Sequence, residues 1–253
     1  MKIRKIVLVS ILFLVGFFVV LIPQSVSAKS WYFERFDSEI AINKESTFWI
    51  KENIQAKFEG QFSQFWRTIP YQKIDFISDI SIIELDLNQA PENYTLDQDS
   101  DGTKITIYQD IKDQTKHWQI KYLVHGALSY QKDWDELYLN TVPAERDVKI
   151  SQGQVLITLP QAVTQDQWKD RIMAETEVES GFEVVDETTV RFWAQELPPG
   201  TNFTIVLGWP KGIIEYHLNR TKILQLIGIF LPILVLVVAI LIWYFKTRDE
   251  RGR

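Results

Sequence analysis

The sequence contains no cysteine among its 253 residues. This absence excludes a disulfide framework, a thiolate nucleophile, a zinc–thiolate site and a cysteine-linked lipid anchor. Histidine is almost as scarce, and the spacing of His117, His125 and His217 favours surface or turn positions over a shared metal site. A chain of this length buries enough core to be stable outside the cell without disulfides. The lack of cysteine therefore favours a bacterial cell surface over a eukaryotic secretory pathway.

Basic residues are also fewer than acidic residues in the part of the chain between its two ends. Residues 29–222 hold 20 basic and 31 acidic residues, a net charge of about −11. Nucleic acids and anionic lipid headgroups both require a basic face on their partner. This balance predicts no nucleic-acid partner.

The first long apolar run covers residues 6–22 and follows the positive residues Lys2, Arg4 and Lys5. Small residues at 26–28 then match a signal-peptidase cleavage site, so residues 1–28 are predicted to be a signal peptide. The run is also nearly long enough to span a bilayer, and the alternative is an uncleaved signal anchor. Both interpretations place the residues that follow outside the cytoplasm.

The second long apolar run covers residues 223–245 and contains no charged residue. At about 1.5 Å per residue it exceeds the hydrocarbon thickness of about 30 Å, which predicts a transmembrane helix. The tail at 246–253 carries four basic residues against two acidic ones. The positive-inside rule places this tail in the cytoplasm, so residues 29–222 are predicted to form an extracytoplasmic domain of a single-pass cell-membrane protein.

Alternating apolar and polar residues dominate the predicted extracytoplasmic domain. The clearest cases, residues 48–58 and 118–124, are typical of half-buried strands. Further short strands are expected at 39–42, 80–87, 104–108, 136–139, 155–159, 189–193 and 202–207, with glycine or proline turns between several of them. Only residues 165–179 have a helical pattern. The sequence therefore predicts an all-β fold, an antiparallel β-sandwich with one C-terminal transmembrane helix.

Several short blocks in a fixed order resemble a bacterial family of predicted membrane proteins, the domain of unknown function 2207. The blocks are Trp31-Tyr32-Phe33 with Phe36-Asp37, Phe58-Glu59-Gly60, 65–70, Ile120-Lys121-Tyr122 with Gly126-Ala127-Leu128, 135–140, Pro199-Gly200 and 209–212. The resemblance covers the predicted extracytoplasmic domain, which corresponds to the N-terminal region of longer members with further membrane and cytoplasmic segments. It departs at Leu139, where the family usually has tryptophan, and near 141–144, where a family glycine is missing. The resemblance implies a fold and a topology but no established activity.

An acidic segment, residues 97–102, is the one local cluster with the spacing of metal ligands. Asp97, Asp99 and Asp101 alternate before Gly102, and alternating carboxylates in a tight loop suit Ca²⁺. The twelfth position of an EF-hand loop would be Tyr108 where a bidentate glutamate is required, and the flanks have strand character. The alternatives are a calcium site and an acidic hairpin turn without metal.

Trp66 and Arg67 lie within an aromatic and apolar block at 65–70. One interpretation makes them a ligand-binding pair, with the guanidinium holding a carboxylate or glycan and stacking on the indole. The other makes Arg67 a structural residue that pairs with a carboxylate and bonds loop carbonyls.

No spacing of residues specifies a reaction, so no catalytic residue is predicted. The pattern Ser129-Tyr130-Gln131-Lys132 lacks the companion motifs of penicillin-binding enzymes. Asp133, Asp135 and Glu136 are the carboxylates that could serve glycoside hydrolysis. We expect a membrane-anchored binding or assembly module whose partner is another membrane protein or an envelope polymer; the alternative is a membrane-anchored hydrolase of cell wall or polysaccharide.

Overall fold

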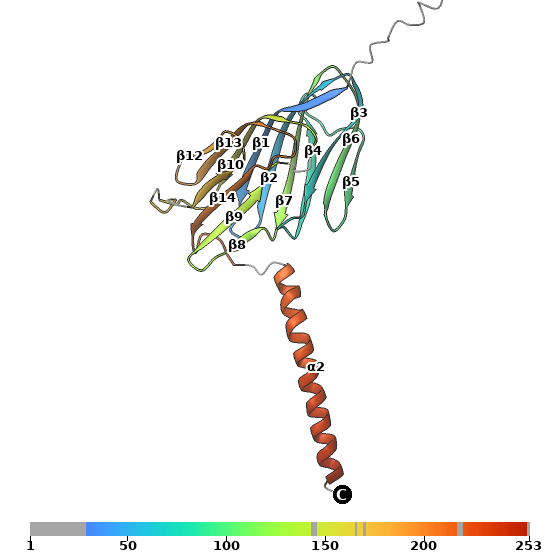
Figure 1. Ribbon diagram of the computed structural model, residues 1–253, viewed down its shortest axis with the longest axis vertical. Helices are drawn as coiled ribbons and strands as arrows, with labels where there is room; N and C mark the ends of the chain where they lie inside the picture. The colour runs from blue at the N-terminus through green and yellow to red at the C-terminus, as the bar shows by residue number, and fades with distance from the viewer. Residues whose placement is uncertain (1–28, 143–145, 165, 169–170, 217–219, 252–253) are drawn as a thin grey trace, which may run out of the picture.

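The computed structural model describes residues 29–142, 146–164, 166–168, 171–216 and 220–251. These residues form a β-rich domain and one long C-terminal helix (Figure 1). The strands belong to three sheets of seven, four and three strands. The all-β class and the apolar helix that the sequence predicted are both confirmed. The predicted signal peptide at 1–28 lies outside the described residues.

The seven-stranded sheet has the order β12-β13-β10-β1-β2-β7-β4. Its strands are β1 Ser30–Ile42, β2 Phe48–Glu59, β4 Phe76–Glu84, β7 Thr115–His125, β10 Ile150–Thr158, β12 Ser180–Val184 and β13 Thr189–Leu197. The strongest alternation in the sequence, at 48–58, is β2, whose even-numbered residues from Phe48 to Phe58 are all buried. Period-two patterning therefore identified an interior strand of this sheet correctly.

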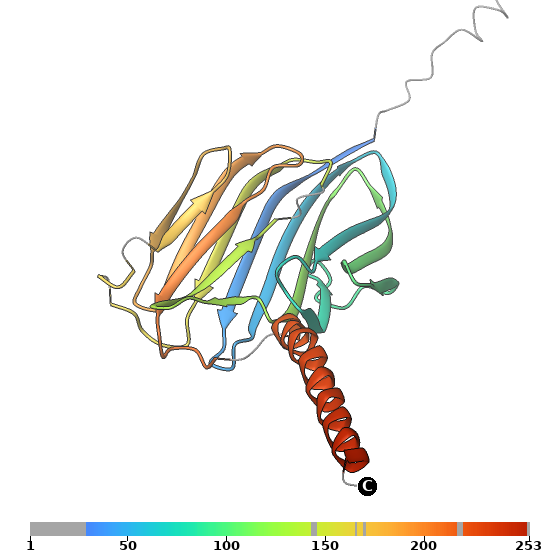
Figure 2. The same cartoon turned by 60° about the horizontal axis from the view of Figure 1, so that its bottom comes forward.

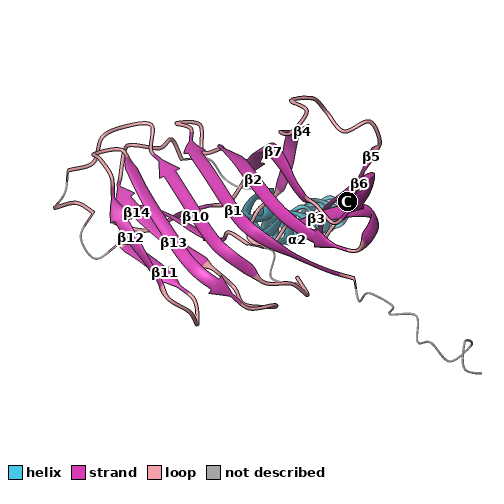
Figure 3. Ribbon diagram, turned by 90° about the horizontal axis from the view of Figure 1, so that it is seen from above, coloured by secondary structure: helices cyan, strands magenta, loops and turns pink. Residues whose placement is uncertain are grey.

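Two smaller sheets cover the inner face of the large one. One has the order β11-β14-β9-β8, with β8 Leu128–Tyr130, β9 Trp134–Asn140, β11 Ile172–Glu175 and β14 Thr204–Pro210; the other has the order β3-β6-β5, with β3 Gln61–Pro70, β5 Tyr94–Gln98 and β6 Gly102–Lys112. Figures 2 and 3 show the second layer interrupted between these two sheets. This interruption positions the candidate site.

Aromatic side chains join the three-stranded sheet to the large sheet. Phe65 of β3 stacks on Trp118 of β7 with ring centroids 4.3 Å apart. Trp31 of β1 contacts Phe65 and Trp66 at 5.8 and 6.0 Å. Each such aromatic pair contributes about 1 kcal/mol beyond its buried area. One aromatic cluster, buried at Phe65 and Trp118, thus holds β3 over the large sheet.

One strand pairing departs from the antiparallel arrangement that the sequence predicted. β1 runs parallel to β10, from Phe33 opposite Ile150 to Ala41 opposite Thr158, whereas the other named ladders among the described residues are antiparallel. Parallel strands need a long crossover. Here the intervening residues form β2 to β9, so the chain returns to β1 only after β2, β4 and β7 of this sheet and most strands of the two smaller sheets.

The helix predicted at 165–179 is wrong. Residues 166–168 form a turn, and Ile172–Glu175 is strand β11, paired antiparallel with β14 from Ile172 opposite Leu207 to Glu175 opposite Thr204. Trp168 is buried in the core. Packing of a β-sandwich edge outweighs the weak helical propensity of this polar segment.

Helix α2 runs from Arg220 to Arg251 and includes Pro232. Its stretch Leu226–Trp243 has a mean hydropathy of 3.1 and is not buried against any other described part of the protein. It is long and apolar enough to cross a membrane. Near the C-terminal end of the β-domain, the Glu215 amide donates to the Lys44 carbonyl at 2.8 Å.

Candidate functional site

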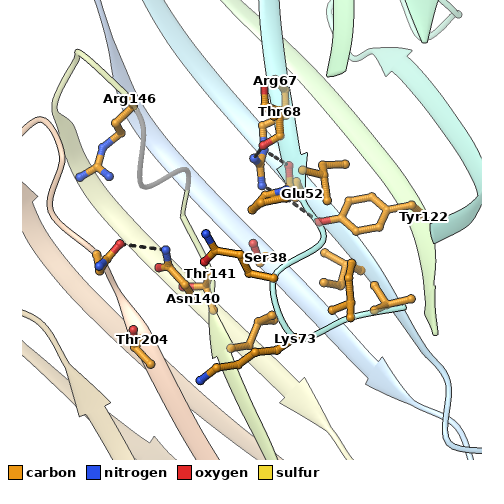
Figure 4. A pocket seen from close by; sticks show the side chains of 18 of the residues that line it. Ser38, Glu52, Arg67, Thr68, Lys73, Tyr122, Asn140, Thr141, Arg146 and Thr204 are labelled. Atoms are coloured by element: carbon orange, nitrogen blue, oxygen red, sulfur yellow. Dashed lines mark hydrogen bonds and ion pairs between the residues drawn. The ribbon is translucent and has the colours of Figure 1, made fainter. Parts of the chain in front are cut away.

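A cleft of about 670 Å³ lies where the second layer is interrupted. We call it the inter-sheet cleft. Its floor is the inner face of β1, β2 and β7, one wall is β3 with the loop that follows it, and the other is β9 with the residues before β14 (Figure 4). The lining residues used below are Trp66, Arg67, Thr68, Gln72 and Lys73 on the β3 side, Tyr138, Asn140, Thr141, Asn202 and Thr204 on the β9 side, and Ser38, Ile40, Ile50, Glu52 and Tyr122 in the floor.

A buried charged cluster occupies one side of the cleft floor. Arg67 Nε and Nη2 donate to Glu52 Oε2 and Oε1 at 2.8 and 2.6 Å. The Tyr122 hydroxyl donates to Glu52 Oε1 at 2.8 Å, and Arg67 Nη1 donates to the Thr68 carbonyl. Both charged side chains are about 95% buried or more. The carboxylate and the guanidinium therefore satisfy each other in a bidentate pair within the protein interior.

The cluster shifts the pKa of two of its members upward. Burial lowers the pKa of Arg67, but the charge and hydrogen bonds of Glu52 outweigh burial and leave that pKa raised. Burial, followed by the nearby Glu52 charge, raises the pKa of Tyr122 well above its ordinary value. Arg67 is thus held as a cation and Tyr122 as a neutral hydrogen-bond donor.

The β9 wall is lined by amides and hydroxyls. Asn140 Nδ2 donates to Asn202 Oδ1 at 3.0 Å, and Asn140 Oδ1 accepts from the Phe203 amide at 3.2 Å. The Thr141 hydroxyl donates to the Phe203 carbonyl at 3.0 Å. These bonds tie the end of β9 to the start of β14 and fix the wall.

Two cationic side chains lie at different ends of the cleft (Figure 4). Lys73, in the loop after β3, places its ammonium 3.4 Å from the ring centroid of Tyr138 on the opposite wall. This cation–π contact joins the two small sheets. Arg146 donates to the Thr201 and Pro198 carbonyls at 2.7 Å, and burial lowers the pKa of its guanidinium to about 10.

Trp66 and Arg67 both line the cleft, but not as a stacked pair. Neighbouring residues of a strand point to opposite faces, so Arg67 is buried while Trp66 is 39% exposed. The guanidinium lies over Phe36, 5.5 Å from the ring centroid. The Glu52 pairing matches the structural interpretation of Arg67, and ligand binding by Trp66 and Arg67 remains a prediction. The sequence signal for Glu52 was its place in the buried row of β2.

The acidic segment forms the turn between β5 and β6. Asp99 Oδ1 accepts from the amides of Asp101 and Gly102 at 2.8 and 3.0 Å, and the Asp99 amide donates to the Gly102 carbonyl at 3.0 Å. Within the described ranges, no group of three or more acidic or histidine side chains is placed to hold a metal ion. The geometry is that of a hairpin turn, and calcium at Asp97, Asp99 and Asp101 remains a prediction.

Asp133, Asp135 and Glu136 do not line the cleft. Asp135 is buried and pairs with Lys211, with Nζ and Oδ1 2.5 Å apart. Glu136 follows it on β9 and accepts from Trp134 Nε1 at 3.4 Å. Adjacent strand residues face opposite sides of the sheet, so these carboxylates are not arranged as an acid and base pair.

Two comparisons concern sequence. Residues 32–209 match the family described as predicted membrane protein (DUF2207) N-terminal domain. No curated protein matches the chain.

The solved structures that resemble the chain are distant. The M1 zinc metallopeptidase of Deinococcus radiodurans shares 9% identity at a TM-score of 0.38, over 70% of this chain and 42% of the peptidase. A candidate nutrient-binding protein of Legionella pneumophila shares 8% identity at a TM-score of 0.45, over 70% of this chain and 67% of that protein. This chain spans about two-fifths of the length of the metallopeptidases it resembles. Likeness at this level carries no argument about function.

Proposed function

We propose, from the premise that this chain belongs to the DUF2207 N-terminal domain family of predicted membrane proteins, that it is a membrane-anchored extracytoplasmic binding module. Helix α2 anchors the module, and residues 29–222 bind a ligand in the inter-sheet cleft. The basic tail at 246–253 supports a cytoplasmic C-terminus. The signal peptide at 1–28 belongs to the same proposed topology.

The observation that carries this proposal is the cleft itself. Its volume of about 670 Å³ lies within the range of ligand sites. Its lining combines an exposed indole at Trp66, several Asn and Thr side chains, and a floor that is apolar beside the buried charged cluster, which is the mixture that binding sites use. Asp133, Asp135 and Glu136, the carboxylates that the sequence suggested for hydrolysis, lie outside the cleft. Binding is therefore the better supported function, with another membrane protein or an envelope polymer as partner.

Photo-crosslinking in native membranes tests this proposal. Gln72 lines the cleft and is exposed, so its replacement by p-benzoylphenylalanine in the full chain places a crosslinker at the site. Thr95 on β5 is exposed outside the cleft and serves as the control position. We expect an adduct from position 72 and none from position 95, resolved by mass spectrometry into polypeptide or polysaccharide. Equal adducts at both positions, or none at position 72, would refute cleft binding.

A further inference from the structure

In the described part of the chain, each wall of the inter-sheet cleft is a strand edge that has no paired neighbour over at least part of its length. β3 pairs with β6 on one side, and among the described residues no strand pairs with its other side. β9 pairs with β14 along its whole length, but β8 covers its other side only as far as Leu137. Residues 66–70 of β3 and 138–140 of β9 therefore present open edges to the same cleft. We call these the cleft edges.

Along an antiparallel strand, the backbone groups of successive residues point alternately to the two neighbouring strands. This alternation shows which backbone groups of β9 face the cleft. The Thr141 amide donates to the Phe203 carbonyl, so odd-numbered residues bond toward β14. The Gln131 amide donates to the Trp134 carbonyl, so even-numbered residues bond toward β8. Tyr138 and Asn140, beyond the end of β8, thus direct their backbone N–H and C=O groups into the cleft.

The same reasoning applies to β3. The Tyr71 amide donates to the Asp101 carbonyl at 2.9 Å. Because the bonds alternate, the backbone groups of Ile69 and Arg67 also point toward β6. The backbone groups of Trp66 and Thr68 consequently face the cleft. The Arg67 guanidinium contacts the Thr68 carbonyl there, a position that a neighbouring strand would otherwise occupy. A carbonyl has two lone pairs, so this contact leaves room for a second donor.

From these edges we infer that the inter-sheet cleft accepts a short extended segment of another polypeptide, which adds as a strand between β3 and β9. The inference rests on the proposed function of the cleft as the binding site. Strand addition satisfies open edges with main-chain hydrogen bonds, and pockets for alternate side chains give selectivity. The inserted strand would join the two small sheets into one continuous layer above the seven-stranded sheet (Figure 3).

The dimensions and lining of the cleft define the segment. Residues 66–70 span about 16 Å at about 3.3 Å per residue, room for roughly five residues. Every second side chain of an inserted strand would face the floor, where Ile40 and Ile50 are apolar. The Lys73 contact with Tyr138 closes one end of the cleft. The segment is therefore short, with apolar residues at alternate positions.

A strand explains the cleft better than a polysaccharide does. An extended polypeptide can pair its own amides and carbonyls with both rows of open backbone groups at once, whereas a glycan has no backbone amides with which to form such ladders. The net charge of about −11 on residues 29–222 also opposes acidic wall polymers. A neutral glycan remains the competing outcome of the experiment.

The test compares Thr68→Pro with Thr68→Ala in the full chain that carries the crosslinker at position 72. Thr68 is exposed, and proline removes its cleft-facing amide while leaving the bonds between β3 and β6 intact. Thr68→Ala removes the side chain but keeps the amide, so it is the reference variant. We expect Thr68→Pro to lower the yield of polypeptide adduct about fivefold relative to Thr68→Ala, the factor that one net backbone hydrogen bond contributes. Equal yields in two folded variants would overturn strand addition.

Hydrogen exchange gives a second measurement that does not depend on the proline variant. In the purified adduct, the amides of Trp66, Thr68, Tyr138 and Asn140 should become protected relative to the free chain, while those of Arg67 and Leu139 should not change. Unchanged exchange at the four cleft-facing amides would overturn the inference.

A polysaccharide adduct would overturn strand addition and leave cleft binding standing, whereas no adduct at all would overturn both.

Discussion

Glu52 and Arg67 are charged residues at positions where their strands otherwise place apolar side chains. Burial of two charges costs several kcal/mol, which their mutual attraction and hydrogen bonds offset. Loss of one partner leaves the other charge buried without compensation. The pair therefore acts as a single unit that holds β3 onto β2 beneath the cleft.

This coupling leads to a prediction for a double-mutant cycle. Arg67→Met should lower the free energy of unfolding by about 3 kcal/mol, because it leaves the Glu52 carboxylate buried without a charged partner. Adding Glu52→Leu should recover most of that loss, since no charge remains buried. Urea unfolding of the full chain in detergent, followed by tryptophan fluorescence, measures both. A double variant no more stable than Arg67→Met would contradict the coupling.

Tyr122 provides a pH dependence. Its pKa is raised in the folded protein, so above about pH 10 the unfolded state loses the Tyr122 proton first and is favoured. Relative to Tyr122→Phe, which cannot titrate, the native protein should keep a constant stability difference below about pH 10. It should lose on the order of 1 kcal/mol of that difference by pH 11, because only the unfolded state has then ionised. Unfolding curves of both proteins at each pH measure this, and a flat difference up to pH 11 would argue against it.

At the scale of secondary structure, the β5–β6 hairpin depends on Asp99. Asp99→Ala removes the acceptor of two turn amides and should lower the free energy of unfolding by about 1 kcal/mol. The loss should be the same with millimolar calcium chloride or with a chelator, because the carboxylate already serves the turn. Thermal unfolding under both conditions provides the measurement. A calcium-dependent rise in midpoint, abolished by Asp99→Ala, would instead establish a metal site at this turn.

The sequence predicted individual strands far better than it predicted their arrangement. Regular alternation identified β2 and β7 because each has one buried face. β3 was missed because Arg67 stands in its buried row between Phe65 and Ile69, which hides the period of two. The parallel pairing of β1 with β10 has no local signal, since the paired residues are more than a hundred positions apart.

The candidate site was predictable only in fragments for the same reason. The sequence suggested Trp66 and Arg67 as an aromatic and cationic binding pair, and both residues line the cleft. Their partners Glu52, Asn140 and Thr204 come from three other strands or strand ends. Only the packing of three sheets brings these residues together. The periodicity of a single strand does not predict how sheets pack.

At the scale of the whole molecule, topology is directly testable because the chain has no cysteine. A single cysteine introduced by Ser100→Cys, in the exposed β5–β6 turn, should react with a membrane-impermeant maleimide in intact cells. One introduced by Thr247→Cys should react only after permeabilisation, because the basic tail is proposed to be cytoplasmic. The opposite labelling pattern would reverse the proposed orientation.

The hydrogen bond between Glu215 and Lys44 holds Glu215 on the β-domain and so limits the distance between this domain and helix α2. Five residue steps separate Glu215 from Arg220, the first residue of α2, and they extend at most about 18 Å. With α2 as the proposed membrane anchor, a connection of this length keeps the β-domain, and the cleft within it, close to the lipid surface. Encounter then becomes a two-dimensional search, in which a partner anchored in the same bilayer meets the cleft at a high effective concentration. Geometry thus favours neighbours in the membrane over freely diffusing molecules, even at equal intrinsic affinity.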